Sequence, residues 1–533
     1  MNNDHDRNTV STIHPSVRGA NLLLLLTMIL VLTLGTVMQL YSISWGLIGT
    51  QIFLLLLPTL LFLRLRRLPA RETLRLRGLD PVLALLAFVI GVAIWPLAGW
   101  LQVLMNILFG YTVPVGPDIF PTTAAQALLL FLALAVAAPI CEEVLFRGAI
   151  QRAYERYGPS RSIVLVGLIF AFFHMRLSGL LPLIPISLAL GYVVWRSDSL
   201  LAGILTHAGN NLMAALLLIV SSLRPDLVED LAGPSLPLAA LGAALAIIGL
   251  WLFRRRTAPQ PISSPPLQRS AFARMWPLGV AALLYVVVGG LEVVIGRYPE
   301  FTAAGQRVTF AAAPWQEPVR WRYELRNVLD DPVGEADCLL SPQNDLLVLT
   351  CQMRQEAFEA QVDGSFWSSD DAEYRTTAVW RREDLYLVEA EGVRESDTLF
   401  FTYTITPVND DLLLRGELPE VSEELSLPPD ALVRFEWPWR LSALPFSLGY
   451  SREMTVAWPL RYRHVTEDSG PDKEEGHLIV RGATPIHTPL GNAIAWHVQV
   501  GDQQAWYDVE PPHHLLHYED GFHTWLLVAV EDQ

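Results

Sequence analysis

Nine long apolar runs occupy the first 295 residues of this 533-residue chain, and they constrain its fold more than any other feature. Most of the runs have about 18–22 residues, the length that an α-helix needs to cross the hydrocarbon layer of a bilayer. The sixth run contains Pro182 and Pro185, which makes it the weakest prediction of the set. The predicted membrane helices are 20–41, 44–63, 82–103, 122–145, 161–177, 179–196, 200–221, 235–253 and 276–295.

The second half of the chain has a different composition. Residues 297–533 carry 18 Lys and Arg against 41 Asp and Glu, and they contain no run long enough to span a membrane. Their short apolar or alternating segments, such as 493–498, are separated by turn residues, which is typical of β-strands. We therefore expect an α-helical polytopic membrane bundle of about eight core helices and a ninth anchoring helix, followed by a mainly β soluble domain. The expected parts are a tail at 1–19, a membrane core at 20–253, a Pro/Ser/Arg linker at 254–275, a last helix at 276–295 and the β domain at 296–533.

Basic residues in the loops predict the orientation. The segments 64–77, 147–161 and 254–256 are rich in Arg, whereas the loop 104–121 has no basic residue. With nine helices the three basic segments lie on one side, which the positive-inside rule makes cytoplasmic. We expect a multi-pass cell-membrane protein with a cytoplasmic N-terminus and an extracytoplasmic C-terminal domain. With eight crossings the domain would instead be cytoplasmic.

Two of the three cysteines lie in the acidic half. Cys338 and Cys351 fall in two short apolar segments on either side of a polar turn, 341–345. They could form a disulfide bond if the domain lies in an oxidising compartment, or remain free thiols in a reducing one. The predicted orientation favours the disulfide bond.

Two adjacent carboxylates, Glu142 and Glu143, lie at the end of the fourth apolar run. Ionised side chains are costly at membrane depth, so their presence there indicates function by default. Arg147 follows Glu143 by four residues, one helical turn, and an ion pair on that face could neutralise the carboxylate. The pair of carboxylates alone would also fit the solvated end of a helix.

Two histidines in later apolar runs strengthen the functional interpretation. His174 ends the sequence FAFFH in the fifth run, and His207 opens HAGNN in the seventh. Helical spacing places Phe170 and His174 on one face, and His207 and Asn211 on another. A single buried histidine is more often bonded to a neighbour than catalytic. Three helices that each offer an acid, a base or an amide are harder to explain by packing.

These residues resemble the three motifs of the CPBP family, which comprises the CAAX prenyl endopeptidases and the bacteriocin-processing or Abi-type proteins. The matching segments are EEVLFRG at 142–148, Phe170 with His174, and His207 with Asn211. They agree with the family motifs in residue type, order and approximate separation. The resemblance covers about residues 120–220 and implies an α-helical membrane peptidase whose site lies inside the bundle.

Peptide hydrolysis needs a base that activates water, an acid for the leaving amine and donors for the oxyanion. A carboxylate held in a low-dielectric site can act as a base near neutral pH. We therefore expect Glu142 to be the base and His174 to position the same water. Glu143 is expected to have a supporting role, and His207 and Asn211 are expected to donate to the oxyanion.

The resemblance leaves a second assignment open, because the family is commonly called metalloprotease. Glu143, His174 and His207 would then bind a divalent metal, for which zinc suits nitrogen and oxygen ligands. The HExxH zinc motif is absent from the sequence. The favoured assignment requires no cofactor.

The predicted helix limits leave these groups at different depths. Glu142 is placed near the cytoplasmic end of its helix, whereas His174 is about 13 residues into the next one, roughly 20 Å deeper at 1.5 Å per residue. The fifth helix would have to begin later or enter tilted for the two side chains to meet.

The expected partners are a membrane-associated peptide or protein substrate and the lipid bilayer, without nucleic acid. The main alternative is a non-catalytic membrane scaffold or bacteriocin-immunity-type protein. A transporter would use the same charges as a proton relay, but it would predict paired internal repeats that the sequence lacks.

Overall fold

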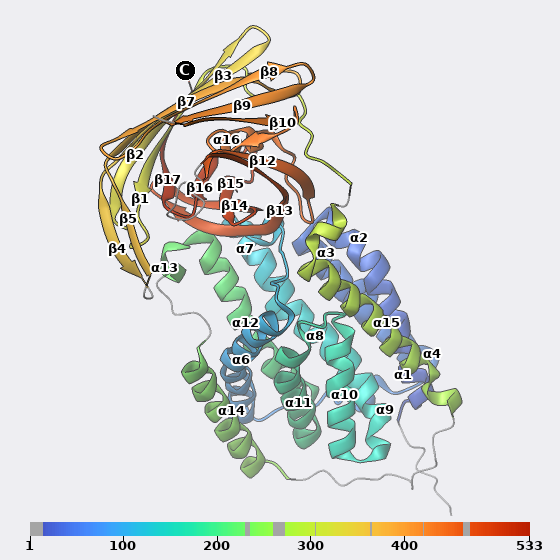
Figure 1. The fold of residues 1–533 in the computed structure, drawn as a ribbon. Coiled ribbons are helices and arrows are strands. Elements are labelled where there is room, and N and C mark those ends of the chain that lie inside the picture. The colour runs from blue at the N-terminus through green and yellow to red at the C-terminus, as the bar shows by residue number, and fades with distance from the viewer. Residues whose placement is uncertain are drawn as a thin grey trace, which may run out of the picture. The chain divides into compact units, whose positions relative to one another are not determined.

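The computed structural model describes residues 14–229, 235–258, 272–303, 305–362, 365–418, 421–461 and 470–532. The chain divides into two compact units (Figure 1). A helical unit comprises Met1–Thr112, Asp118–Leu223 and Leu227–Arg297. A β unit comprises Val113–Pro117, Arg224–Asp226 and Tyr298–Gln533.

Within the described residues, eight helices are long and apolar enough to cross a membrane, and a ninth is apolar but short. All nine predicted runs are therefore helical, and the predicted fold class is confirmed. The eight long helices are Val17–Tyr41, Ile43–Leu65, Pro81–Phe109, Ala124–Tyr157, Leu180–Ser197, Leu200–Leu223, Leu236–Arg256 and Arg274–Arg297, and the short one is Pro159–Phe173.

Polar side chains define where several of these helices begin. Ser16 accepts a hydrogen bond from Gly19 N–H at the start of the first helix, and Asp80 caps the third. The first three spans and the short helix before the third contain α1 (Val17–Leu30), η1 (Val31–Gly35), α2 (Thr36–Tyr41), α3 (Ile43–Gly49), η2 (Thr50–Leu56), α4 (Leu57–Leu65), α5 (Ala70–Thr73) and α6 (Pro81–Phe109).

The fourth helix is longer than predicted. A capping box of Thr123 and Gln126 starts it, and it continues to Tyr157 instead of ending at residue 145. The sequence interpretation took the charges after 142 as interfacial, but Glu143 and Arg147 are buried and bond each other at 3.0 Å. The span contains α7 (Ala124–Phe131), η4 (Leu132–Ala137), α8 (Ala138–Glu143), η5 (Val144–Ile150), α9 (Gln151–Tyr154) and η6 (Glu155–Tyr157).

The fifth helix is short, whereas the sixth run, the weakest prediction because of its prolines, is a full helix. Helix α10 (Pro159–Phe173) has 15 residues, about 22 Å, and it ends four residues before the predicted limit. Helix α11 (Leu180–Ser197) is continuous although it contains Pro185. The later helices are α12 (Leu200–Leu223), α13 (Asp226–Glu229), α14 (Leu236–Arg256), α15 (Phe272–Arg297) and η7 (Pro299–Thr302).

Two predicted parts fall largely outside the described residues. The linker at 254–275 is described only at its ends, because 259–271 lie outside, and the tail at 1–19 is described only from residue 14.

The β unit contains one 15-stranded sheet, which Figure 1 shows as a strongly curved wall. Its strand order is β10-β9-β8-β7-β6-β3-β2-β1-β17-β16-β15-β14-β13-β12-β11, and β4 and β5 form a separate pair. The strands are β1 (Val319–Arg326), β2 (Pro332–Gln343), β3 (Leu346–Gln355), β4 (Phe358–Val362), β5 (Ser365–Ser369), β6 (Ala372–Arg381), β7 (Leu387–Ser396), β8 (Phe400–Val408), β9 (Asp411–Leu418), β10 (Val421–Leu427), β11 (Leu432–Val433), β12 (Ser451–Arg461), β13 (Gly470–Thr488), β14 (Gly491–Val500), β15 (Gln503–Asp508), β16 (Leu515–Glu519) and β17 (Thr524–Asp532).

Alternating burial along the strands builds the core of this unit. In β1 every second residue is buried, as expected for a sheet with one covered face. The short helix α16 (Trp437–Arg440), followed by η8 (Leu441–Ala443), supplies two buried tryptophans. Trp439 Nε1 donates to Tyr323 Oη at 3.3 Å, and Tyr507 Oη donates to the carbonyl of Pro438 at 2.7 Å.

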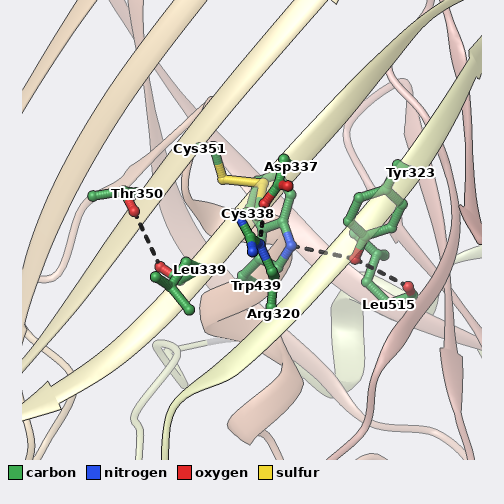
Figure 2. The surroundings of a disulfide bond; sticks show 9 residues. All are labelled: Arg320, Tyr323, Asp337, Cys338, Leu339, Thr350, Cys351, Trp439 and Leu515. Atoms are coloured by element: carbon green, nitrogen blue, oxygen red, sulfur yellow. Dashed lines mark hydrogen bonds and ion pairs between the residues drawn. A yellow bond between two sulfur atoms is a disulfide. The ribbon is translucent and has the colours of Figure 1, made fainter. Parts of the chain in front are cut away.

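A disulfide bond joins Cys338 to Cys351 (Figure 2). The two residues face each other directly in the antiparallel pairing of β2 with β3. The register of the two strands thus brings the side chains together, and the turn at 344–345 is shorter than the predicted 341–345 because β2 continues to Gln343.

Candidate active site

The site is built on an antiparallel helix pair that brings Glu142 and His174 to the same level. The fourth helix ends at Tyr157 and α10 begins at Pro159. Glu142 lies 15 residues before that end, and His174 lies 15 residues after that beginning. At 1.5 Å per residue both are about 22 Å from the connection. The longer fourth helix removes the difference in depth that the predicted limits implied.

The backbone around the two glutamates is irregular. Pro139 cannot donate a backbone hydrogen bond, and the π-helical segments η4 and η5 flank α8 on both sides. Single π-helical turns are rare and are often found at functional sites, because they change the direction in which side chains point. Here they flank the turn that carries Glu142 and Glu143.

Glu142 faces the interior of the helical unit and is 7 % exposed. Its Oε1 accepts a hydrogen bond from Gln51 Nε2 at 2.8 Å, and its Oε2 lies 3.8 Å from His207 Nε2. Among the described residues, Oε2 has no hydrogen-bond partner. One carboxylate oxygen is thus fixed and the other is available.

Glu143 is held differently, although it is the next residue. It is fully buried, and its Oε1 accepts from Arg147 Nη1 at 3.0 Å and from His207 Nδ1 at 3.0 Å. Arg147 also donates to the carbonyl of Ser187 and lies 4.6 Å above the Phe170 ring. These contacts leave Glu143 in a buried ion pair behind the site.

A glycine in α12 allows this helix to lie close to Glu143. A Cβ atom at Gly203 would lie 2.8 Å from Glu143 Oε2 and 2.6 Å from the Val194 side chain. Any larger residue would push α12, and with it His207, away from the glutamates.

His174 is the C-cap of α10, immediately before Met175 in the left-handed region at φ 55°. Its Nδ1 lies 2.9 Å from the carbonyl oxygen of Phe170. A carbonyl only accepts, so Nδ1 carries the proton, and in the neutral ring Nε2 is an acceptor.

His207 and Asn211 lie one turn apart on α12, as the spacing predicted. Asn211 Nδ2 donates to the carbonyl of Leu134 at 2.9 Å, and Asn210 donates to Asn211 Oδ1 at 3.3 Å. An amide nitrogen has two protons, so the second N–H of Asn211 remains available as a donor.

Four of the five predicted catalytic residues line one cavity of about 200 Å³. They are Glu142, His174, His207 and Asn211, joined by the supporting residue Phe170. Glu143 lies behind this cavity. The complete lining is Leu47, Gln51, Ala133, Leu134, Ala138, Glu142, Phe170, His174, Leu183, Ile186, His207, Asn210 and Asn211.

The sequence interpretation missed two polar residues of this lining, Gln51 and Asn210. Gln51 interrupts the second apolar run together with Thr50, and a buried amide in such a run is a signal that could have been used. Its partner, Glu142, lies 91 residues away, so the pairing itself depends on the fold.

The last helix does more than anchor the chain, because it holds the loop that follows His174. Leu177 N–H donates to Glu292 Oε2 of α15 at 2.6 Å, and Ser178 Oγ donates to the other carboxylate oxygen. The rings of Phe172 and Tyr285 stack at 4.5 Å on the same two helices, α10 and α15. Glu292 thus fixes the backbone three to four residues after His174.

The residues proposed as metal ligands are not arranged as a ligand set. Glu143 Oε1 accepts hydrogen bonds from both Arg147 and His207, so it is not free to bind a metal. Across the described parts of the chain, no group of three His, Cys, Asp and Glu side chains is placed to hold a metal ion. Glu143, His174 and His207 therefore do not fit a metal in this arrangement.

The fold and the cavity define a multi-pass membrane protein with buried carboxylate, histidine and amide groups in its helical core. Residues 124–213 match the family described as type II CAAX prenyl endopeptidase Rce1-like, and the chain thus carries an Rce1-like domain. This agrees with the CPBP resemblance, and the matched segment contains every residue that carried it. Neither the curated proteins nor the solved structures gave a match to the chain.

Proposed function

We propose that this protein is an intramembrane endopeptidase that hydrolyses a peptide bond of a membrane-associated peptide or protein with a water molecule activated by Glu142. The observation that carries the proposal is the cavity that Glu142, His174, His207 and Asn211 line together. Its volume of about 200 Å³ is below the 300–1,000 Å³ of a typical ligand pocket. It suits a water molecule and an extended peptide segment, not a folded substrate.

The contacts support separate roles for the two glutamates. The available Oε2 of Glu142 can take a proton from water as the water oxygen attacks the carbonyl carbon. His174 Nε2 can accept a hydrogen bond from the second O–H of that water. This bond orients the lone pair of the water oxygen for attack. Arg147 neutralises Glu143, and Glu143 accepts a hydrogen bond from His207 Nδ1, which is a supporting role.

The tetrahedral intermediate needs donors for its oxyanion. The free N–H of Asn211 is one such donor, and His207 Nε2 is another when that nitrogen carries a proton. Collapse of the intermediate breaks the C–N bond, and the proton taken up by Glu142 passes to the leaving nitrogen. The reaction consumes one water and requires no cofactor.

A cleavage assay on the purified full chain in liposomes tests the proposal. Peptides are offered with and without a prenyl group, because the matched family is named for prenylated substrates. We expect cleavage that persists after treatment with a zinc chelator. Loss of cleavage on chelation with recovery on adding zinc would favour the metal assignment instead. No cleavage of any membrane-bound peptide would favour the scaffold or immunity alternative.

We also propose that the N-terminus is cytoplasmic and the β domain extracytoplasmic. Nine helices give an odd number of crossings, and the basic segments fall on one side of them. Two loops, Val113–Pro117 and Arg224–Asp226, each follow an odd number of helices, whereas the basic segments each follow an even number. Both loops belong to the β unit, where Ala483 N–H donates to the carbonyl of Val115 at 2.8 Å. The Cys338–Cys351 bond suits the same compartment.

A membrane-impermeant thiol reagent on intact cells tests this orientation. The Cys141→Ala variant removes the free buried cysteine, so that only Cys338 and Cys351 remain. We expect labelling only after an impermeant reductant has opened the disulfide bond. A matched variant that adds R256C to C141A should gain no label at residue 256 until the cells are lysed. Labelling at residue 256 in intact cells, with none at Cys338 or Cys351 after reduction, would reverse the orientation.

A further inference from the structure

The β unit contains a cavity that the peptidase proposal does not use. Its volume is about 1450 Å³, larger than the 300–1,000 Å³ of a typical small-molecule site. Its lining comes from β3 to β8, from α16 and its preceding loop, from Trp458 of β12 and from the end of the chain. Its aromatic lining includes Phe401, Tyr403, Phe435, Trp439, Tyr518 and Trp525.

These rings form a rigid apolar wall. Tyr403 stacks between Phe401 and Phe435 at centroid distances of 6.2 Å to each, and Trp439 meets Trp525 edge to face at 6.0 Å. Burial raises the pKa of Tyr403 far above its ordinary value, so its phenol is neutral. A wall of this kind gains free energy by covering hydrocarbon.

The backbone of the cavity floor argues against a peptide as the ligand. Strands β3, β6, β7 and β8 of the large sheet are each hydrogen-bonded to a neighbour on both sides, so an added strand could pair only with the separate β4–β5 pair at one side of the cavity. The N–H and C=O groups of a peptide on these rings would lose water without gaining partners, which is costly. A hydrocarbon chain has no such groups.

Beside the aromatic wall, polar and charged side chains line the cavity, among them Asp370, Arg394 and Asp520. Gln355 is 3 % exposed and His523 is 9 % exposed, and both line the cavity. Gln355 Oε1 and His523 Nε2 have no hydrogen-bond partner among the described residues, although both are buried. Buried polar atoms are normally satisfied, so these two indicate a ligand with a hydrogen-bonding end.

We propose that this cavity binds a single-chain amphiphile, with a long hydrocarbon chain along the aromatic wall and a polar end near Gln355 and His523. The β unit follows α15 directly, from Arg297 to Tyr298, so it is tethered to the bilayer where such molecules occur. The hydrocarbon part of the ligand is either an acyl chain or an isoprenoid chain, since both present the same hydrocarbon surface. This proposal does not depend on the peptidase activity.

Photolabelling of the full-length protein in membrane vesicles tests the proposal. Two probes are compared, a fatty acid and an isoprenoid alcohol, each carrying a diazirine and an alkyne. We expect one or both to label peptides of β3, β6 or β8, and an excess of the corresponding unlabelled compound to suppress that label at least about tenfold. The probe that labels the β unit shows whether the bound hydrocarbon is an acyl chain or an isoprenoid chain. Labelling confined to the membrane helices would overturn the proposal.

A pair of variants on one strand provides the matched control. Thr376 of β6 lines the cavity, whereas its neighbour Thr377 points to the opposite face of the sheet. Thr376→Trp should fill the cavity and lower the label on the β unit about tenfold, whereas Thr377→Trp should leave it unchanged. Labels on the membrane helices serve as the internal reference for both variants. Equal labelling of the two variants would show that the probe binds elsewhere, and competition in the unmodified protein decides the question even if Thr376→Trp does not fold.

Discussion

Replacing Glu142 with Gln should lower the rate of peptide cleavage by about 10²–10⁴-fold, the usual contribution of a general base. The amide keeps the size of the side chain and can still accept the hydrogen bond from Gln51, but it cannot take a proton from water. The measurement is the rate of cleavage by the purified variant in liposomes, together with its thermal stability. The loss should appear in the catalytic step, with the helical unit still folded.

The matched control is Glu72→Gln, the same change at an exposed position of α5. It should leave cleavage unchanged. If Glu142→Gln cleaves within about tenfold of the unmodified protein, Glu142 is not the base. The cavity would then need another activating group.

Replacing Arg147 with Met should destabilise the helical unit by about 3–5 kcal/mol, the usual cost of removing one partner from a buried ion pair. Arg147 is 1 % exposed and Glu143 is fully buried, so the variant leaves a carboxylate that has lost its guanidinium partner. The cation above the Phe170 ring and the bond to the Ser187 carbonyl are lost as well. Denaturant unfolding in detergent micelles measures the change in the free energy of unfolding.

The double variant Glu143→Gln with Arg147→Met separates the ion pair from packing. It removes both charges, and it should recover much of the stability that the single variant loses. Arg64→Met, at an exposed position of α4, is the matched control for the loss of one arginine. A loss for Arg147→Met of no more than about 1 kcal/mol, as for a surface pair, would contradict the buried ion pair.

Local sequence patterns were sufficient to predict the membrane helices and the β character of the C-terminal half. An 18-residue apolar run has few options other than a spanning helix, because its backbone groups must be satisfied within the segment. The same principle identified Glu142, His174 and His207, since ionisable groups in such runs are costly. The i, i+4 spacing of Glu143 and Arg147 also predicted the ion pair that the structure contains at 3.0 Å.

Helix limits were harder to predict from the sequence. The end of the fourth helix was placed at 145 because charged residues follow. The sequence does not show whether a distant residue will neutralise such a charge. Arg75, 80 residues before Glu155, bonds that carboxylate at 2.6 Å and allows it to be buried. Together with the local Arg152–Glu155 pair at 3.0 Å, this long-range pairing lets the helix continue to Tyr157, and the extension in turn brings Glu142 level with His174.

The sequence by itself determined that the chain is a multi-pass membrane protein, that polar residues of several helices are candidates for one site, and that a β domain follows. The tertiary structure decided which glutamate faces the cavity and which is buried in an ion pair. It also placed Gln51 beside Glu142 and Glu292 beside the loop after His174. Those contacts join residues 91 or more positions apart, and their energy depends on distances that only the packed helices set. The cavity of the β unit has the same origin, because alternation along single strands specifies a covered face but not how 15 strands curve around it.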